Sequence, residues 1–314
     1  MTVYACDIGS SSVSIYNADT NGYIHRKGLG TERLVEEATD ALRSLDIGPG
    51  DTVVHRIVIG GDRESPYKLT GKRLETLRKY ERYASLHQPV QLDVACHALE
   101  TFPADHYAYF DTSFHTSIPR HRKRYGLHRD DKDLARFGYH GINCEGVTEG
   151  LRGGLVVCHL GSGCSVTAVQ DGESVATSMG RTPLDGVLMR TRPGSLDPGV
   201  VLEIVRRKGS VEAADTYFNE ECGWEGMSGE SLKSLVNNRP GDDVVQYFVE
   251  SVAENVAKVT THLEGRDTVV FTGGVGENNE YLRRAIIESV SFLGFDSFKV
   301  VEACEEQVMV SSFL

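Results

Sequence analysis

Three short glycine loops in this sequence have the composition of sites that bind phosphate. The third lies at residues 267–278, where the strand-like D-T-V-V-F-T runs into G-G-V-G-E-N and then into a helical pattern. A strand, glycines and a helix N-terminus in this order can turn backbone N–H groups toward a phosphate. The other two loops lie within residues 3–17 and 154–173, and both are typical of a strand, a Gly/Ser turn and a second strand. Each loop, taken alone, can equally be a simple hairpin.

The first two loops resemble each other. In both, a cysteine stands three positions before the first glycine, a serine follows that glycine, and an alternating strand pattern comes next. The second loop is one residue longer. This weak internal repeat, together with the third loop, indicates a nucleotide held between two similar halves.

Two charged residues stand where an unpartnered charge would be costly. Arg56 lies within the apolar strand pattern V-H-R-I-V-I, and burial of a guanidinium group requires a partner, which favours a functional pairing. Asp111 follows the apolar stretch 107–110 and should lie at the carboxyl end of a strand, where open α/β sheets present functional groups. The alternative for Asp111 is a capping residue ahead of Thr-Ser.

Helical periodicity marks the segments that must support these loops. Residues 242–263 carry apolar side chains at helical spacing after Pro240 and two aspartates, which predicts a helix that packs on a core. Residues 31–45 predict a second amphipathic helix. The basic run R-H-R-K-R at 120–124 is typical of a solvated loop.

Composition limits the class of protein. A chain of 314 residues with 33 glycines and nine prolines has material for two domains. No apolar run reaches the roughly 18 residues of a membrane span, and the N-terminus lacks a secretory pattern, so we expect a soluble cytoplasmic protein without a membrane partner. Seven scattered cysteines indicate neither disulfides nor zinc. A net charge of −12 argues against nucleic acid as a partner.

Ten phrases resemble the signature segments of the acetate kinase family, in the same order. The first-half phrases are D-I-G-S-S-S (7–12), V-H-R-I-V-I-G-G (54–61), L-H-Q-P (86–89), F-D-T-S-F-H-T-S-I-P (110–119) and F-G-Y-H-G (137–141). The second-half phrases are H-L-G-S-G-C-S-V (159–166), T-S-M-G-R-T-P-L-D-G (177–186), T-R-P-G-S-L-D-P (191–198), M-S-G-E-S (227–231) and F-T-G-G-V-G-E-N (271–278).

The resemblance implies a fold and an activity. The fold is α/β, a duplicated ribonuclease-H-like or actin-type arrangement of two domains, expected at 1–112 and 113–314, with most nucleotide contacts in the second. The implied enzyme is a carboxylate kinase that transfers the γ-phosphoryl group of ATP to a small organic acid in a direct in-line step. Mg²⁺ is the implied cofactor, and a homodimer is the implied assembly.

The resemblance also assigns catalytic residues. A carboxylate is already ionised at neutral pH and needs no general base, but it must approach an anionic phosphate. Arginine suits that task because its planar fork pairs with carboxylate and phosphate. Arg56 and Arg192 match the family's two arginines, His140 matches the histidine that supports the transferring group, and Asp111 is assigned to orienting an arginine or the Mg²⁺ hydration shell. Without the resemblance, Arg192 would be interpreted as a surface turn residue and His140 as structural.

Further residues follow from the same matches. The implied apolar pocket for the acid, and the implied phosphate loops, draw on both halves of the sequence. The expected substrate residues are Val58, Leu86, His87, Tyr139 and Pro183. The expected nucleotide and phosphate residues are Ser10, Ser12, His159, Gly161, Ser162, Gly163, Gly273, Gly274, Val275, Gly276 and Asn278.

The sequence departs from the family at both ends. It ends at V-M-V-S-S-F-L, about where the family continues to an Asn-Glu-Glu-type segment, so we expect the acidic side chain that helps to hold magnesium there to be absent. Asp7 stands where the family has asparagine, and our hypothesis is that this carboxylate replaces the lost one as a metal ligand.

Other departures leave alternatives open. Ser14 replaces a lysine, Arg181 and Arg190 replace Phe and Gly, and Tyr139 adds a hydroxyl to the substrate pocket. These changes favour a more polar acid, and the trimmed segment 227–233 leaves pyrophosphate open as the donor. Loss of the lysine and of the C-terminal acid leaves a nucleotide-sensing pseudokinase as a third possibility.

Overall fold

The computed structural model describes residues 1–9 and 12–314, and for Thr31 the backbone alone. The predicted phosphate contact Ser10 therefore lies outside the described residues. These residues divide into two compact units. The first unit comprises 1–116, 139–146 and 304–314, and the second comprises 117–138 and 147–303. The expected division at 112/113 lies close to the first crossing between units, but the chain then returns to the first unit twice.

The described part of the first unit forms a sheet in the strand order β3-β2-β1-β4-β6-β5. Strands β1, β2 and β3 form an antiparallel meander, while β4 pairs parallel with both β1 and β6. The strands are β1 (Val3–Ile8), β2 (Ser12–Asn17), β3 (Gly22–Lys27), β4 (Thr52–Ile57), β5 (Tyr67–Lys68) and β6 (Asp105–Phe110).

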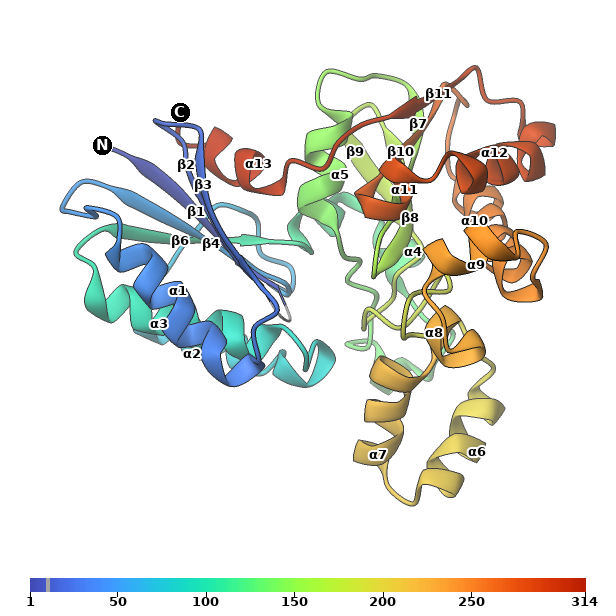
Figure 1. Ribbon diagram of the computed structural model, residues 1–314, viewed down its shortest axis with the longest axis horizontal. Helices are drawn as coiled ribbons and strands as arrows, with labels where there is room; N and C mark the ends of the chain where they lie inside the picture. Colours follow the sequence, from blue (N-terminus) through green and yellow to red (C-terminus); the bar gives the residue numbers. More distant parts are fainter. Residues whose placement is uncertain (10–11) are drawn as a thin grey trace. The chain divides into compact units, whose positions relative to one another are not determined.

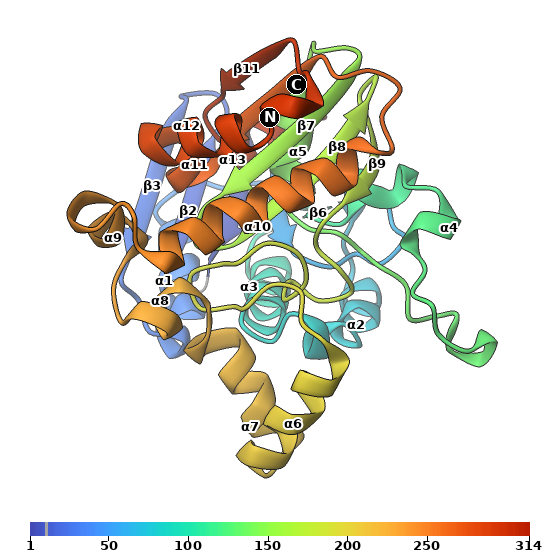
Figure 2. The same ribbon diagram turned by 90° about the vertical axis from the view of Figure 1, so that its right-hand side faces the viewer.

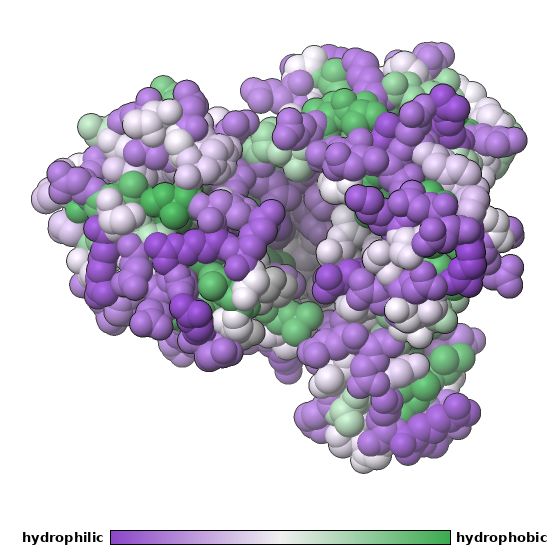
Figure 3. Space-filling model, in the orientation of Figure 1, coloured by the Kyte–Doolittle hydropathy of each residue, from purple (hydrophilic) through white to green (hydrophobic). Residues whose placement is uncertain are grey.

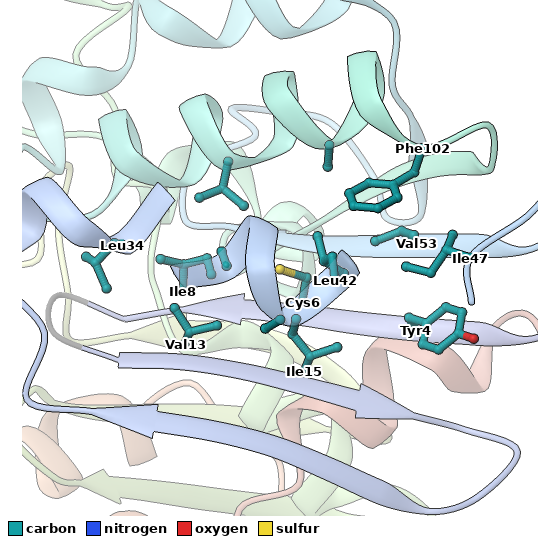
Figure 4. Packing of buried hydrophobic residues seen from close by; sticks show 14 of the residues in the cluster. Tyr4, Cys6, Ile8, Val13, Ile15, Leu34, Leu42, Ile47, Val53 and Phe102 are labelled. Carbon is teal, nitrogen blue, oxygen red and sulfur yellow. The ribbon is translucent and has the colours of Figure 1, made fainter. Parts of the chain in front are cut away.

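Helices cover both faces of this sheet (Figure 1). One face packs against α1 and α3 in an apolar core that includes Cys6, Leu34 and Phe102 (Figure 4). The opposite face packs against the C-terminal helix α13. The helices of this unit are α1 (Thr31–Arg43), α2 (Gly71–Arg78), α3 (Gln88–Thr101), α13 (Glu305–Ser311) and, continuing into the second unit, α5 (Gly141–Thr148), with short 3₁₀ turns at Glu81–Tyr83 and Ser113–Ser117.

The described part of the second unit repeats the same topology in the order β11-β10-β7-β8-β9. Strands β7, β8 and β9 form an antiparallel meander, and β10 pairs parallel with β7 and β11. The weak internal repeat of the sequence is therefore a repeat of structure. The strands are β7 (Gly154–Leu160), β8 (Cys164–Gln170), β9 (Glu173–Thr177), β10 (Thr268–Thr272) and β11 (Ser297–Val300).

Helix α10 (Asp243–Thr260) confirms the predicted core helix. Asp242 caps its first turn by accepting from the Val244 amide, and the predicted apolar stripe is buried. The helix lies along the face of β7 and β8 (Figure 2). The other helices of this unit are α4 (Arg120–Lys123), α6 (Pro198–Lys208), α7 (Val211–Thr216), α8 (Gly223–Ser228), α9 (Leu232–Asn238), α11 (Gly273–Asn278) and α12 (Glu280–Ser289), with 3₁₀ turns at Arg129–Asp131 and Ser291–Leu293 and a π turn at Tyr217–Glu221.

No helix among the described residues is both long enough and apolar enough to span a membrane.

A buried histidine pair joins β4 to β6. His106 Nε2 lies 3.2 Å from the Phe102 carbonyl oxygen, which can only accept, so His106 carries its proton there. Its Nδ1 then accepts from His55 Nε2 at 3.1 Å. Burial lowers the pKa of both imidazoles, and for His55 the neighbouring His106 lowers it further. The fold therefore requires two neutral rings.

This pair predicts acid sensitivity. Below pH of about 6.5 the unfolded chain binds protons at these two positions that the folded chain does not, so the free energy of unfolding should fall as the pH falls. His55→Gln retains a donor toward His106 and removes one titrating group, so its urea midpoint should fall less between pH 7.5 and 5.5. His128→Gln, which alters an exposed histidine, should lose as much as the unmodified chain; equal losses for all three would contradict the assignment.

Candidate functional site

Arg56 is the centre of a charge cluster in the first unit. It lies on β4, and its guanidinium contacts three carboxylates from three other segments. Nη1 lies 3.0 Å from Asp7 Oδ2 at the end of β1 and 2.8 Å from Glu305 Oε2 at the start of α13. Nη2 and Nε donate to Asp111 Oδ2 at 3.0 and 3.2 Å. The expected partner of the buried arginine is thus present.

Strand register explains why these groups meet. Arg56 pairs with Tyr109 across β4 and β6, so Asp111, two residues further along, projects from the same face. Cys6 pairs with His55 across β1 and β4, which places Asp7 beside Arg56. This is the face that α13 covers. Asp111 follows the last residue of β6, where the sequence predicted it.

Burial of three acids around one arginine perturbs the pKa values of the cluster. Burial raises the pKa of Asp111, although Arg56 opposes the shift. Burial likewise raises the pKa of Glu305 to about 8. The charge of Arg56 opposes this rise, whereas Asp111 and Asp7 add to it. Burial alone would lower the pKa of Arg56, but the three carboxylates hold it well above its ordinary value. The guanidinium therefore stays charged while the acids compete for it.

Two carboxylate oxygens of the cluster point away from the arginine. Asp7 Oδ1 and Asp111 Oδ1 are buried, and neither has a hydrogen-bond partner among the described residues. Unpartnered buried oxygens of this kind call for a cation or water. A three-residue His/Cys/Asp/Glu metal cluster is not found in the part of the chain that the structure describes.

Glycine brings His140 to the same edge of the sheet. The Gly141 amide donates to the Asp111 carbonyl at 2.9 Å, and a Cβ at Gly141 would overlap that carbonyl. His140 itself has a positive φ of 58°, a conformation uncommon for residues other than glycine. The backbone is thus held so that His140 directly precedes α5, next to the glycine whose amide bonds to Asp111.

Two buried glutamines support the chain after β4, and the sequence analysis did not select them. Gln91 Oε1 accepts from the Val58 amide and its Nε2 donates to Ile8, while Gln88 exchanges two hydrogen bonds with the backbone of Ile59. Gln88 lies in the L-H-Q-P phrase, which was the available signal. These amides fix the predicted substrate residue Val58.

The other predicted substrate residues divide between the units. Leu86 and His87 precede α3, where His87 is the N-cap and its carbonyl accepts from Gln91. Tyr139 is buried, and His115 contacts its carbonyl oxygen at 2.9 Å. Pro183 lies in the second unit.

The phosphate loops of the second unit lie against each other. Gly161 follows β7, and a Cβ built on it would stand 3.8 Å from His159 Nε2 and 4.0 Å from the Gly274 amide nitrogen. Gly273 has a φ of 78°, and a Cβ there would come within 2.8 Å of the Leu160 carbonyl. The loop after β10 thus approaches the end of β7 closely because Gly273 lacks a side chain, whereas a Cβ at Gly161 would make ordinary contacts.

Some loop amides have internal partners. The Gly161 amide donates to the Gly163 carbonyl at 3.1 Å, and the Gly273 amide donates to Glu277 Oε1 at 2.8 Å. The amides of these two glycines are therefore engaged within the loops themselves. Gly276 packs against Leu160.

Arg192 lies beside the first of these loops. The Arg190 amide donates to the Ser162 carbonyl at 3.1 Å, which ties the segment to the loop. Burial raises the pKa of Cys164 to about 12, and the charge of Arg192 opposes this rise, as expected of a nearby cation. Arg192 Nη1 also donates to the Pro183 carbonyl at 3.0 Å.

A pocket of about 370 Å³ opens next to the glycine loop that follows β10. Val275 and Asn278, which the sequence assigned to the nucleotide, line it together with Gly274. Asn278 Nδ2 donates to the Gly274 carbonyl at 3.0 Å. The remaining lining residues are Leu232, Lys233, Val236, Asn237, Asn279, Glu280 and Tyr281.

Comparison with known proteins decides the family. The family model described as the acetokinase family matches residues 32–312. This chain belongs to the acetokinase family. The acetate kinase of Rickettsia prowazekii is 36% identical over 76% of this chain and 67% of its own length. That of Methylocella silvestris is 34% identical over 82% of this chain and 68% of its own.

A solved structure confirms the predicted fold of this acetokinase. The crystal structure of a propionate kinase from Francisella tularensis matches with a TM-score of 0.86 at 26% identity, covering 98% of this chain and 97% of that one. Together with the repeated sheet topology, the match confirms the duplicated, actin-type α/β fold.

One expectation about the acetokinase is wrong. The C-terminal segment was expected to supply no acidic side chain to the site, but Glu305 from α13 joins Arg56. Its neighbour Glu306 accepts from Ser14 Oγ at 2.6 Å. The E-A-C-E-E-Q phrase at 302–307 was the missed signal. Ser12, the described serine of the first loop, has its carbonyl bonded to the Gly9 amide.

The cluster predicts a large stability effect at Arg56. Arg56→Met would leave buried carboxylates without a cation, so the free energy of unfolding should fall by about 3–5 kcal/mol. Arg33→Met removes an exposed arginine and should cost less than about 1 kcal/mol. Urea unfolding followed by circular dichroism measures both, and equal effects would show that the Arg56 cluster contributes nothing beyond a surface pair.

Proposed function

We propose that this acetokinase is an acetate-kinase-like enzyme that transfers the γ-phosphoryl group of ATP to the carboxylate of a short-chain acid. Family membership identifies it as a phosphotransferase with a carboxyl acceptor. The observation that carries the proposal is the meeting of two glycine loops beside Arg192. His159 and the Gly274 amide flank the position of Gly161 there.

The residues support a transfer without a general base. The acid enters as a carboxylate and attacks the γ-phosphorus in line while the bond to ADP breaks, giving an acyl phosphate and ADP. Arg56, Arg192 and His140 reduce the repulsion between the two anions and donate to the equatorial oxygens of the transferred group. Val58, Leu86, Tyr139 and Pro183 hold the alkyl end of the acid.

The residues present also fit Mg²⁺. This ion is bound in kinases by one or two carboxylates together with phosphates and waters, so a three-residue protein cluster is not required. Asp7 and Asp111 each offer a buried oxygen that has no hydrogen-bond partner within residues 1–9 and 12–314. When bound, Mg²⁺ would neutralise charge on the β- and γ-phosphate oxygens. Asp7 remains the proposed metal ligand, and Glu305 adds the acidic group that was expected to be missing.

ATP is the donor that the pocket beside Gly274 supports. Its volume of about 370 Å³ suits a nucleoside, and Leu232, Val236 and Tyr281 offer apolar contacts among its polar lining residues, which pyrophosphate would not use.

Some of the observations that prompted the alternatives have another explanation. Arg181 bonds to backbone carbonyls of 133 and 135, and Arg190 lies 3.7 Å from Glu225, so both guanidinium groups have protein partners. They do not favour a more polar acid. Glu305 removes the main argument for a pseudokinase.

Hydroxylamine trapping tests the activity. With ATP and Mg²⁺ the protein should give acyl hydroxamates from acetate and propionate and much less from butyrate, succinate or glycolate. Pyrophosphate in place of ATP, or EDTA in place of Mg²⁺, should reduce the yield to background. Absence of hydroxamate from every acid, with ATP binding retained by calorimetry, would refute the proposed function.

We also propose a homodimer that covers α6. Every side chain of this helix is at least partly exposed, and Val200, Leu202 and neighbouring Val211 are 49%, 56% and 66% exposed. Figure 3 shows apolar surface on the lobe that α6 and α7 form. A second copy that packs on this surface would remove these side chains from water.

A charge on α6 tests the dimer. Leu202→Lys should lower the dimer fraction in sedimentation velocity at least tenfold because a charge would be buried at the interface. Val300→Lys alters a similarly exposed apolar residue on β11 and should have no effect. A monomeric unmodified chain would disprove the assembly.

A further inference from the structure

Arg136 connects two loops of the second unit that are distant in sequence. Its Nη1 donates to the carbonyls of Ser178 and Met179 at 2.8 and 2.6 Å and to Asp185 Oδ2 at 3.1 Å. The side chain of Arg136 is 15% exposed and that of Asp185 is 31% exposed. A largely buried guanidinium that makes this many bonds fixes the geometry of what it contacts.

Arg181 makes the reciprocal connection. Its Nη1 donates to the Asp133 and Ala135 carbonyls at 2.7 and 3.3 Å, and its guanidinium stacks over the Phe137 ring at 4.6 Å. Its amide donates to Tyr125 Oη at 2.8 Å. An arginine from each loop thus donates hydrogen bonds to backbone carbonyls of the other loop. We call this pair of loops, residues 133–138 and 178–186, the arginine clasp.

Backbone bonds close the clasp at Gly180. The amides of Phe137 and Gly138 both donate to its carbonyl, at 3.1 and 3.2 Å. A Cβ on Gly180 would stand 2.6 Å from Tyr125 Oη and 2.8 Å from Asp185 Oδ2. Glycine is favoured here because the side chains of Tyr125 and Asp185 occupy the space that a Cβ would need. Gly138 is also the residue from which the chain continues to Tyr139 and His140.

Asp185 connects the arginine clasp to the loop that contains Arg192. Its second oxygen, Oδ1, accepts from Ser195 Oγ at 2.6 Å and from the Gly186 amide at 3.0 Å. The Ser195 amide donates back to the Gly186 carbonyl at 3.0 Å, which closes the loop 186–195. Arg192 lies within that loop, and its Nη1 bonds to Pro183. Hydrogen bonds, together with the short chain segments 183–185 and 192–195, therefore connect Arg136 to the arginine assigned to the phosphoryl group.

We propose that Arg136 and Asp185 are positioning residues, which hold the loop of Arg192 so that its guanidinium meets the transferring phosphoryl group. This inference rests on the proposed function, because it assigns a purpose to the placement of Arg192. Positioning errors reduce the rate of transfer more than they reduce nucleotide binding, since a donor aimed at the transition state must be correctly placed. The pocket beside Gly274 has no lining residue in the clasp.

Substitution of Arg136 tests the inference. Arg136→Lys keeps the charge but loses the planar fork, and Arg136→Ala loses both. Each variant should lower kcat in the hydroxamate assay by at least about tenfold, because a misplaced donor usually costs that much or more in rate. KM for ATP should change by less than about threefold. Asp185→Asn serves if the Arg136 variants do not fold. Arg129→Ala changes a side chain that is 88% exposed and lies just before the clasp loop 133–138. Its kcat and its KM for ATP should equal those of the unmodified enzyme.

Two readouts separate positioning from general stabilisation. Millimolar guanidinium ion should restore part of the activity of Arg136→Ala, whereas sodium chloride at equal ionic strength should not. Amide hydrogen exchange over residues 178–195 should be faster in Arg136→Ala than in the unmodified chain. Unchanged kcat, or a loss that guanidinium does not restore and that only follows the folded fraction, would overturn the proposal.

Failure of the function and failure of the clasp give different results. If the unmodified protein forms no acyl phosphate, the proposed function fails while hydrogen exchange still reports the loop. Unchanged exchange in Arg136→Ala would reject the clasp whatever the activity.

Discussion

The contact on which the first unit depends is the one between Arg56 and three carboxylates. A guanidinium on a central strand is tolerated because Asp7, Asp111 and Glu305 surround it from β1, β6 and α13. The three acids depend on Arg56 in turn, because they would repel one another without its positive charge. Strand pairing and the docking of α13 are therefore coupled to a site that is built to handle charge.

The same cluster has features that fit the proposed phosphoryl transfer. Three acids share one arginine, and among the described residues two of their oxygens, on Asp7 and Asp111, lack hydrogen-bond partners. In our proposal these oxygens accept a cation, which two anionic reactants need between them. The carboxylates already hold the arginine in place, so the proposed transfer would need little reorganisation of its guanidinium.

The second unit uses the same topology for a different purpose. Its parallel strands β7 and β10 end in glycine loops, where the first unit has charged side chains. Glycine at position 273 lets the loop after β10 approach Leu160, and the clasp of Arg136 and Arg181 holds the neighbouring loop that carries Arg192. The duplicated fold thus provides charged side chains in one half and glycine loops in the other.

The sequence by itself determined the local elements and the family. Alternating and helical patterns located β1, β7, β10 and α10, and the order of ten motifs pointed to the acetokinase fold. Arg56 and Asp111 could be selected because a charge in an apolar strand, or at the end of one, is visible locally. The roles of Arg192 and His140 came from the motifs alone, since their local patterns fit a surface turn and a structural histidine.

Tertiary structure alone decided which residues these charges meet. Glu305 lies about 250 positions after Arg56, and no period or propensity relates them, so only the packing of α13 on the sheet brings them together. Gln88 and Gln91 follow the same rule, because a polar residue on a helix shows its partner only after the helix has docked. Arg181 was interpreted as favouring a more polar acid because its charge was visible, while the carbonyls that hold it were not. Local sequence sets conformation through short-range sterics, but the partner of a buried polar group is set by which distant segments share a face.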